Sequence, residues 1–269
     1  MTHTAPALSC LMLAATVCAA SAQVLHQEDI LRAELRPGWR MADGRQMAAL
    51  HLQLAPDWKT YWRNPGDAGL PPEFDWSRSR NAASVKVHWP RPEVFDFQGM
   101  QTIGYRHEVV LPVEVTPLDP AAQVTLEADI ALGVCNDICM PAHLALAAAL
   151  PRAEAPDPAI AAALAAGPMD AASAGLSGLR CSITPISDGL RVSATMTLPA
   201  GPGPETVVME PADPVWVSDA IIARVGDQLE ASADLVPGPG KTYALRADAL
   251  RLTVLGQGRA IEVIGCPVE

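Results

Sequence analysis

The chain has 269 residues, a net charge of −11 and an isoelectric point near 4.9. Binding to phosphate groups needs clustered Lys and Arg side chains, so this charge argues against nucleic acid and against anionic membrane surfaces as partners. No stretch beyond the N-terminal segment is apolar for long enough to form a transmembrane helix, so we expect a chain with no membrane span. Its length suits one large domain or two ordinary ones.

The first 22 residues predict a cleaved signal peptide. They contain no Lys, Arg, Asp or Glu and end in the small-x-small sequence Ala20-Ser21-Ala22. We therefore place the mature start near Gln23 and expect export to the periplasm. Four cysteines remain after cleavage, and an even number in an oxidising compartment predicts disulfides.

Residues 23–152 predict an all-β domain. Short runs of alternating or β-branched residues are separated by Pro and Gly, which is typical of strands joined by turns. These runs are Gln46–Leu54, Ser84–Trp89, Glu108–Val115 and Val124–Leu132. Strands at this spacing predict an antiparallel β-sandwich of the immunoglobulin type.

An aromatic segment, DWKTYWRNPGDAGLPP, follows the first predicted strand. Its tryptophans suit a sandwich core. Its turn-forming residues suggest instead an ordered loop, and aromatic side chains on such a loop often line a site. We therefore take Tyr61, Trp62 and, further along the chain, Tyr105 as candidate site-lining residues.

A cysteine pair, Cys135 and Cys139, lies in the segment GVCNDICMP after the last of these strands. A disulfide needs Cα atoms about 4.4–6.8 Å apart. Four residues of extended strand span roughly 13 Å, so the chain has to turn between the two cysteines if they are bonded. Asn136 and Asp137 are suitable turn residues.

Residues 153–178 form the next segment, which is rich in Ala, Pro, Gly and Ser and has no aromatic residue. This composition predicts a linker, with a short helix over Pro158–Ala166 that uses Asp157 as its N-cap. Residues 179–269 then predict a second β-sandwich domain. Its strand-like runs are Arg191–Leu198, Thr206–Met209, Val215–Val217, Ala220–Val225 and Arg251–Leu255.

Loop-closure entropy separates the four cysteines into two pairs. A Cys135–Cys139 bond closes a ring of five residues, which contributes only about 2 kcal/mol to stability, whereas a Cys181–Cys266 bond closes a loop that contributes roughly 4.6 kcal/mol. Strained, exposed disulfides are also the ones that exchange readily. We therefore predict that Cys135 and Cys139 are redox-active and that Cys181 and Cys266 form a structural disulfide. The alternative for the first pair is a small permanent bridge.

Metal binding is another alternative for the first pair. Cys135, Cys139 and His143 recur at intervals of four with Met140 alongside, and soft sulfur ligands suit Cu(I). That spacing brings the ligands to one face of a helix, but Pro141 argues against a helix and no fourth ligand is evident. We predict no metal and no other cofactor.

The first domain resembles the N-terminal periplasmic domain of the thiol:disulfide interchange protein DsbD and, more closely, the copper-sensitivity suppressor ScsB group. The likeness is carried by WPRPEVFDFQGMQTIGYRHEVVLPVEV and GVCNDICMP, with TYWRNPGDAGLPPEFDW typical of the ScsB group. It implies an immunoglobulin-like fold with two active cysteines. It also implies that the second of these, Cys139, forms the mixed disulfide with a partner.

The resemblance further implies a cap over the cysteines. In the family an aromatic residue followed closely by a glycine shields the sulfur atoms, and Asp96-Phe97-Gln98-Gly99 stands at that place. Phe97 is thus the expected shield, with Asp96 the one matching acidic residue of the cap. An apolar ring over the sulfurs excludes small oxidants and has to move aside for a partner. The alternative for Phe97 is ordinary core packing.

Two features depart from DsbD itself. Only three residues separate the cysteines here, and the membrane-embedded and thioredoxin-like domains of DsbD do not follow within the 269 residues. We expect either that a separate membrane protein supplies electrons or that the protein acts outside that pathway.

The leading hypothesis is a protein-disulfide reductase-type exchange protein that works with thioredoxin-like periplasmic partners. The alternatives are a non-catalytic binding module that docks a partner or carries Cu(I), which would fit a role in copper tolerance, and a purely structural exported protein.

Overall fold

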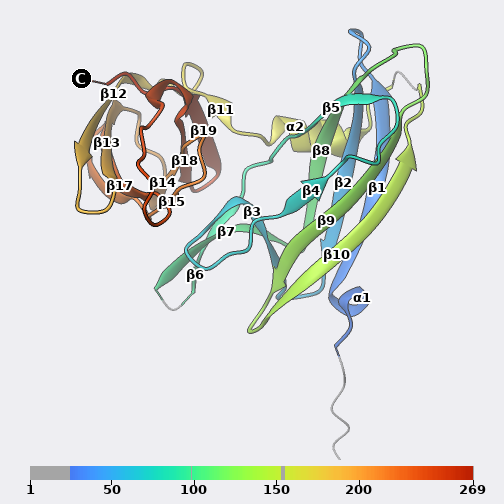
Figure 1. The fold of residues 1–269 in the computed structure, drawn as a ribbon, viewed down its shortest axis with the longest axis horizontal. Helices are drawn as coiled ribbons and strands as arrows, with labels where there is room; N and C mark the ends of the chain where they lie inside the picture. Colours follow the sequence, from blue (N-terminus) through green and yellow to red (C-terminus); the bar gives the residue numbers. More distant parts are fainter. Residues whose placement is uncertain (1–24, 98, 153–154, 269) are drawn as a thin grey trace, which may run out of the picture.

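The computed structural model describes residues 25–97, 99–152 and 155–268, so the predicted signal peptide lies outside the described residues. Strands account for 56% of the chain and helices for 6%, which confirms the prediction of an all-β, immunoglobulin-like fold. Figure 1 shows two β-rich units connected through a segment that carries one short helix. Each unit is built from two sheets.

The first unit stacks two antiparallel sheets. The first sheet has the strand order β1 (Leu31–Arg40), β2 (Gln46–Leu54), β8 (Glu108–Pro117), β5 (Ala82–Val87). The second has the order β10 (Cys139–Ala149), β9 (Thr125–Cys135), β3 (Lys59–Gly66), β7 (Met100–Arg106), β6 (Glu93–Phe97), with the short strand β4 (Glu73–Asp75) also paired with β9. Strand β10 is therefore an outer strand of the second sheet.

The second unit repeats this plan on a smaller scale. One sheet has the order β11 (Met169–Asp170), β19 (Arg259–Ile264), β18 (Arg251–Gly256), β14 (Glu205–Glu210), in which β11 and β19 run parallel. The other has the order β12 (Ser177–Pro185), β13 (Leu190–Thr197), β17 (Gln228–Val236), β15 (Trp216–Val217), with β16 (Ile221–Val225) also paired with β17. Short helical elements precede two of the strands: α1 (Gln27–Ile30) lies before β1 and η1 (Ala247–Ala249) before β18.

Helix α2, Pro158–Ala165, lies in the segment predicted as a linker, and the predicted N-cap is in place. The Asp157 carboxylate accepts hydrogen bonds from backbone N–H groups of the first turn, including that of Ile160. Ile160 is fully buried and packs with Met47 and Ala49 of β2. The helix therefore fastens this segment to the first unit.

Each unit has its own apolar core, but the first core extends into the second unit. The buried side chains of the first unit cluster with three residues of the second, which are Val208, Leu255 and Ala260. A separate cluster between the two sheets of the second unit includes the cysteines Cys181 and Cys266. The two units thus share an apolar contact.

A buried cation strengthens this contact. The Arg63 guanidinium, on β3, forms a two-pronged ion pair with Glu210, with both N–O distances 2.9 Å, and a second ion pair with Glu262 at 2.7 Å. The exposed fractions of the Arg63 and Glu210 side chains are only 15% and 16%. Its Cζ atom lies 4.1 Å from the centre of the Trp62 ring, and the carboxylates keep the pKa of Arg63 raised against the opposing effect of burial.

Two acidic residues also meet between the units. Asp67 follows β3, Asp219 lies between β15 and β16, and both line a small hollow between the units. Burial, followed by the hydrogen bond and negative charge of Asp67, raises the pKa of Asp219 from 3.8 to about 6. We therefore expect protonation of Asp219 to relieve its repulsion with Asp67.

Candidate functional site

The candidate site lies where β9 turns into β10. Cys135 is the last residue of β9 and Cys139 the first of β10; the two are disulfide-bonded, with Cα atoms 4.1 Å apart. The turn between them is closed by a hydrogen bond of 2.9 Å from the Asn136 N–H to the Ile138 carbonyl. Cys135 is only 1% exposed, whereas Cys139 is exposed and Ile138 is 60% exposed. One sulfur-bearing residue is thus buried and the other faces solvent.

The strand register places four residues in one row across the sheet. Cys139 is opposite Cys135, Cys135 is opposite Lys59, and Lys59 is opposite Arg106. Side chains of directly opposed residues lie on the same face of a sheet, so the disulfide shares its face with two cations. The segment that carries Lys59 was expected to be a loop, but it forms strand β3 up to Gly66.

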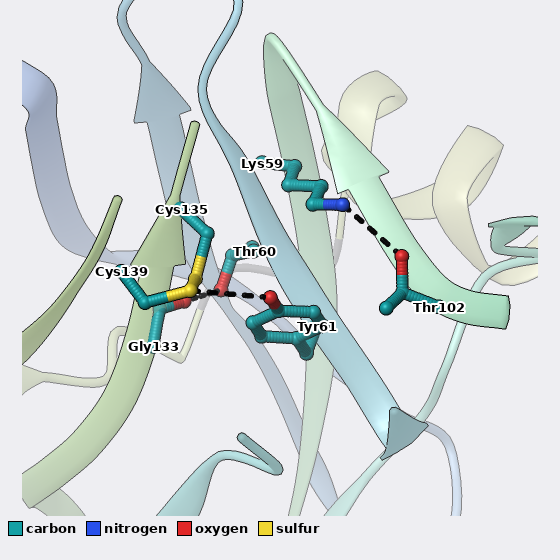
Figure 2. The surroundings of a disulfide bond; sticks show 7 residues. All are labelled: Lys59, Thr60, Tyr61, Thr102, Gly133, Cys135 and Cys139. Carbon is teal, nitrogen blue, oxygen red and sulfur yellow. Dashed lines mark hydrogen bonds between the residues drawn. A yellow bond between two sulfur atoms is a disulfide. The ribbon is translucent and has the colours of Figure 1, made fainter. Parts of the chain in front are cut away.

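Tyr61 comes from the same strand and reaches the disulfide. Its hydroxyl lies 3.7 Å from the Cys139 sulfur (Figure 2). The ring fits because residue 133 is a glycine: a Cβ atom there would lie 3.3 Å from the Tyr61 ring and 2.9 Å from the Leu70 Cβ. The Gly133 carbonyl also accepts a hydrogen bond of 2.9 Å from the Thr60 hydroxyl. Burial raises the pKa of Tyr61, so its hydroxyl remains protonated and can donate a hydrogen bond.

The two cations of the row share one aromatic ring. The Lys59 ammonium lies 5.2 Å and the Arg106 guanidinium 4.2 Å from the centre of the Phe95 ring. Figure 2 shows Lys59 extending towards Thr102, to which it donates a hydrogen bond of 3.1 Å. Burial, followed by the charge of Arg106, lowers the pKa of Lys59. Phe95, Lys59 and Arg106 therefore border the site, and no sequence motif predicted them there.

The predicted cap lies on the hairpin of β6 and β7. Phe97 ends β6 with its backbone opposite Met100, and its side chain is outside the described part of the structure. Asp96 is exposed and its carboxylate accepts a hydrogen bond of 3.3 Å from the Gly99 N–H. The aromatic ring that the structure describes on this strand is that of Phe95, two residues before Phe97, and it is buried.

The other two candidate lining residues lie in the core. Trp62 is fully buried and belongs, with Tyr105, to the apolar cluster between the sheets. The Tyr105 hydroxyl donates a hydrogen bond of 2.8 Å to the Pro90 carbonyl. Alternation along β3 explains the division, because Tyr61 and Trp62 are neighbours and so point to opposite faces. Only Tyr61 of the three lies beside the disulfide.

The second cysteine pair is also bonded. Cys181 and Cys266 are 1% and 3% exposed, with Cα atoms 5.7 Å apart. Their backbones are held by hydrogen bonds from the Cys181 N–H to the Pro267 carbonyl at 2.7 Å and from the Cys266 N–H to the Ala247 carbonyl at 2.8 Å. Both cysteines lie inside the core of the second unit, where a partner has no access to them.

Comparison with known proteins assigns the first unit to a family. The family model for the N-terminal part of the thiol:disulfide interchange protein DsbD matches residues 22–151, the stretch that contains the exposed disulfide. This part of the chain is a DsbD/ScsB-type N-terminal domain. It is therefore a thiol–disulfide interchange module.

The similarity to this group extends beyond the DsbD-type domain. The chain is similar to the crystal structure of the N-terminal periplasmic domain of ScsB from Proteus mirabilis, with 25% identity, a TM-score of 0.65, and 91% of this chain and 97% of that chain covered. No curated protein matches the sequence. In the described part of the structure, no helix is long and apolar enough to cross a membrane.

Proposed function

We propose that this chain is a periplasmic exchange protein that relays electrons through the Cys135/Cys139 couple to or from partner proteins. The observation that carries the proposal is the asymmetry of the hairpin disulfide, in which Cys139 is exposed and Cys135 is buried. A partner thiolate can approach Cys139 only, so Cys139 forms the mixed disulfide and Cys135 is the leaving and resolving group.

The reaction runs in two balanced steps. A thiolate of a reduced dithiol partner attacks the Cys139 sulfur, the Cys135–Cys139 bond breaks, and Cys135 leaves as a thiolate that takes up a proton. The second partner thiol, after losing its proton, then attacks its own half of the mixed disulfide and releases Cys139. Two electrons and two protons thus pass to this protein, and the reverse sequence delivers them to an oxidised partner.

The neighbouring groups suit these steps. The Tyr61 hydroxyl can donate a hydrogen bond to Cys139 when that sulfur carries the negative charge. Lys59 and Arg106 lie on the same face as the disulfide and favour negative charge there. Stabilising the thiolate makes the couple easier to reduce and thus available for exchange.

The proposal extends to location, partners and domain organisation. Residues 1–22 direct export, and residues 23–152 form the redox domain. A linker over 153–178 joins it to a second sandwich over 179–269. The partners are thioredoxin-like periplasmic proteins or a separate membrane electron carrier, as the resemblance to DsbD suggests. The Cys181–Cys266 bond has a structural role in this account, which its burial supports.

The Cu(I) alternative gains no support from the geometry. The described residues contain no group of three or more His, Cys, Asp or Glu side chains that could hold a metal ion. His143 follows Cys139 by four residues of an extended strand, a separation of roughly 13 Å.

A trapping experiment with a defined partner tests the proposal. Oxidised mature protein is mixed with a thioredoxin variant that keeps only its attacking cysteine, and the mixed disulfide is mapped by mass spectrometry. The expected product joins thioredoxin to Cys139. In the Cys139→Ser variant Cys135 is a free thiol with no disulfide to attack, so the Cys181–Cys266 bond is the disulfide that remains. This variant is the specificity control and should form no adduct, because that second bond is buried. Absence of any adduct, or equal attack at Cys135 and Cys139, would overturn the proposal.

A further inference from the structure

The backbone beside the exposed cysteine is an open sheet edge. Strand β10 pairs with β9 on one side and is an outer strand of its sheet. Two residues directly opposed across an antiparallel pair have Cα atoms about 5.5 Å apart when their N–H and C=O groups bond to the partner strand. Their Cα atoms are about 4.5 Å apart when these groups point away from the partner strand. The Cα separation of 4.1 Å between Cys135 and Cys139 is of the second kind. The N–H and C=O of Cys139 therefore point outwards, away from β9.

Two other contacts support this orientation. The Gly133 carbonyl, opposite Pro141, bonds to the Thr60 hydroxyl on the β3 side and so faces away from β10. His143 follows Cys139 by four residues, so its backbone groups point to the same side of β10 as those of Cys139. Both its N–H and its C=O form hydrogen bonds with the Gln27 side chain, which lies on the side of β10 away from β9. The distances are 3.0 Å to the Gln27 Oε1 and 3.2 Å from the Gln27 Nε2. The alternate residues of β10 thus direct their backbone groups towards the edge.

Gln27 shows what fits against this edge. Its carboxamide accepts from the His143 N–H and donates to the His143 C=O, as a peptide group of an added strand would. Pro141 has no N–H to offer. The open strip between the hairpin turn and Gln27 therefore presents one donor and two acceptors, the Cys139 N–H, the Cys139 C=O and the Pro141 C=O. No hydrogen bond from another described segment reaches these groups.

We propose that the edge of β10 from Cys139 to Pro141 is a docking strip for an extended backbone segment of the protein that exchanges its disulfide with Cys139. The inference rests on the proposed function and adds the means of recognition. An added strand supplies affinity through backbone hydrogen bonds, which do not depend on the partner's side chains. The strip is contiguous with the exposed Ile138 and with the reactive sulfur, so pairing would align the partner with Cys139. Gln27 ends the strip and limits the length of strand that can add.

The test uses the full mature chain as the Cys135→Ser variant, in which Cys139 stays free. The probe is a synthetic seven-residue peptide of Thr and Val with a central cysteine, and its mixed disulfide with Cys139 is equilibrated against glutathione. Each peptide amide is N-methylated in turn. Loss of one hydrogen bond of about 1 kcal/mol should lower the exchange constant about fivefold. The expected pattern is alternating: methylation weakens binding at amides that face β10 and changes it less than twofold at the amides between them.

Removing Gln27 provides a second readout. Gln27→Ala frees the backbone groups of His143, so a peptide longer by two residues should gain about fivefold in exchange constant over the seven-residue peptide. Gln123→Ala, at an exposed glutamine in the turn before β9, is the matched control and should give no gain.

The outcomes separate the two proposals. Equal tolerance of methylation at every amide, or losses at consecutive amides without alternation, would overturn the docking strip while leaving exchange at Cys139 intact. Failure of Cys139 to form a mixed disulfide with any peptide or with glutathione would overturn the proposed function itself.

Discussion

Replacing Arg63 with alanine should loosen the contact between the two units. The change leaves Glu210 and Glu262 without their main cation, while Arg251, 3.6 Å from Glu262, compensates only in part. Removing one partner of a buried ion pair typically costs about 3–5 kcal/mol. The Arg63 and Glu262 side chains retain 15% and 26% exposure, so we expect the lower end, about 3 kcal/mol.

Denaturant unfolding measures this loss, followed by tryptophan fluorescence. The matched control is Arg78→Ala, which breaks the Arg78–Asp129 pair, whose side chains are 57% and 46% exposed. An exposed pair contributes less than about 1 kcal/mol. Arg63→Lys keeps the charge but not the two-pronged geometry and should fall between the two. If Arg63→Ala costs no more than Arg78→Ala, the buried ion pair does not hold the units together.

Three further substitutions concern the second disulfide, the acidic residues between the units and the tyrosine beside Cys139. Cys181→Ser combined with Cys266→Ser should lower the free energy of unfolding by about 4–5 kcal/mol, because the loop that this disulfide closes is long; denaturant titration measures the loss. The reduction potential of the Cys135–Cys139 disulfide should stay unchanged, which thiol quantification checks. The pKa of Asp219 is raised in the folded protein, so the proton stabilises the fold at low pH and that stability is lost as pH rises through about 6. Asp219→Asn should therefore reduce the difference in unfolding midpoint between pH 5 and pH 7.5, and an unchanged difference would refute this assignment. Tyr61→Phe removes the hydroxyl beside Cys139 and should slow alkylation of the reduced thiol by iodoacetamide at pH 7 about three- to tenfold; an unchanged rate would mean that the hydroxyl does not stabilise the thiolate.

The strands that sequence pattern could identify are those with one clearly apolar face. The run Gln46–Leu54 coincides with β2, and the run Glu108–Val115 lies within β8. Strand β10 could not be recognised, because it is rich in alanine and contains Pro141. It tolerates the proline as an outer strand, where the missing N–H faces away from β9.

The sequence was enough to predict the two cysteines of the site, but not the neighbouring side chains that the pairing of distant strands brings to them. Spacing and loop closure were enough to select Cys135 and Cys139, and both are bonded at the hairpin turn. Lys59 and Arg106 reach this face only through pairing between β3, β7 and β9, which no local pattern encodes. Tyr61 was predicted to line the site as part of a loop, but it lies on strand β3, from which its hydroxyl contacts the Cys139 sulfur.

The reduction potential of the Cys135–Cys139 disulfide decides most directly whether this protein exchanges disulfides. Oxidised protein is equilibrated in glutathione buffers, alkylated and mapped by mass spectrometry, so that the buried Cys181–Cys266 bond serves as an internal reference in the same sample. We predict a potential in the range of exchange proteins, about −180 to −270 mV, while the reference bond stays oxidised. A potential below about −300 mV, typical of inert structural bridges, would contradict it.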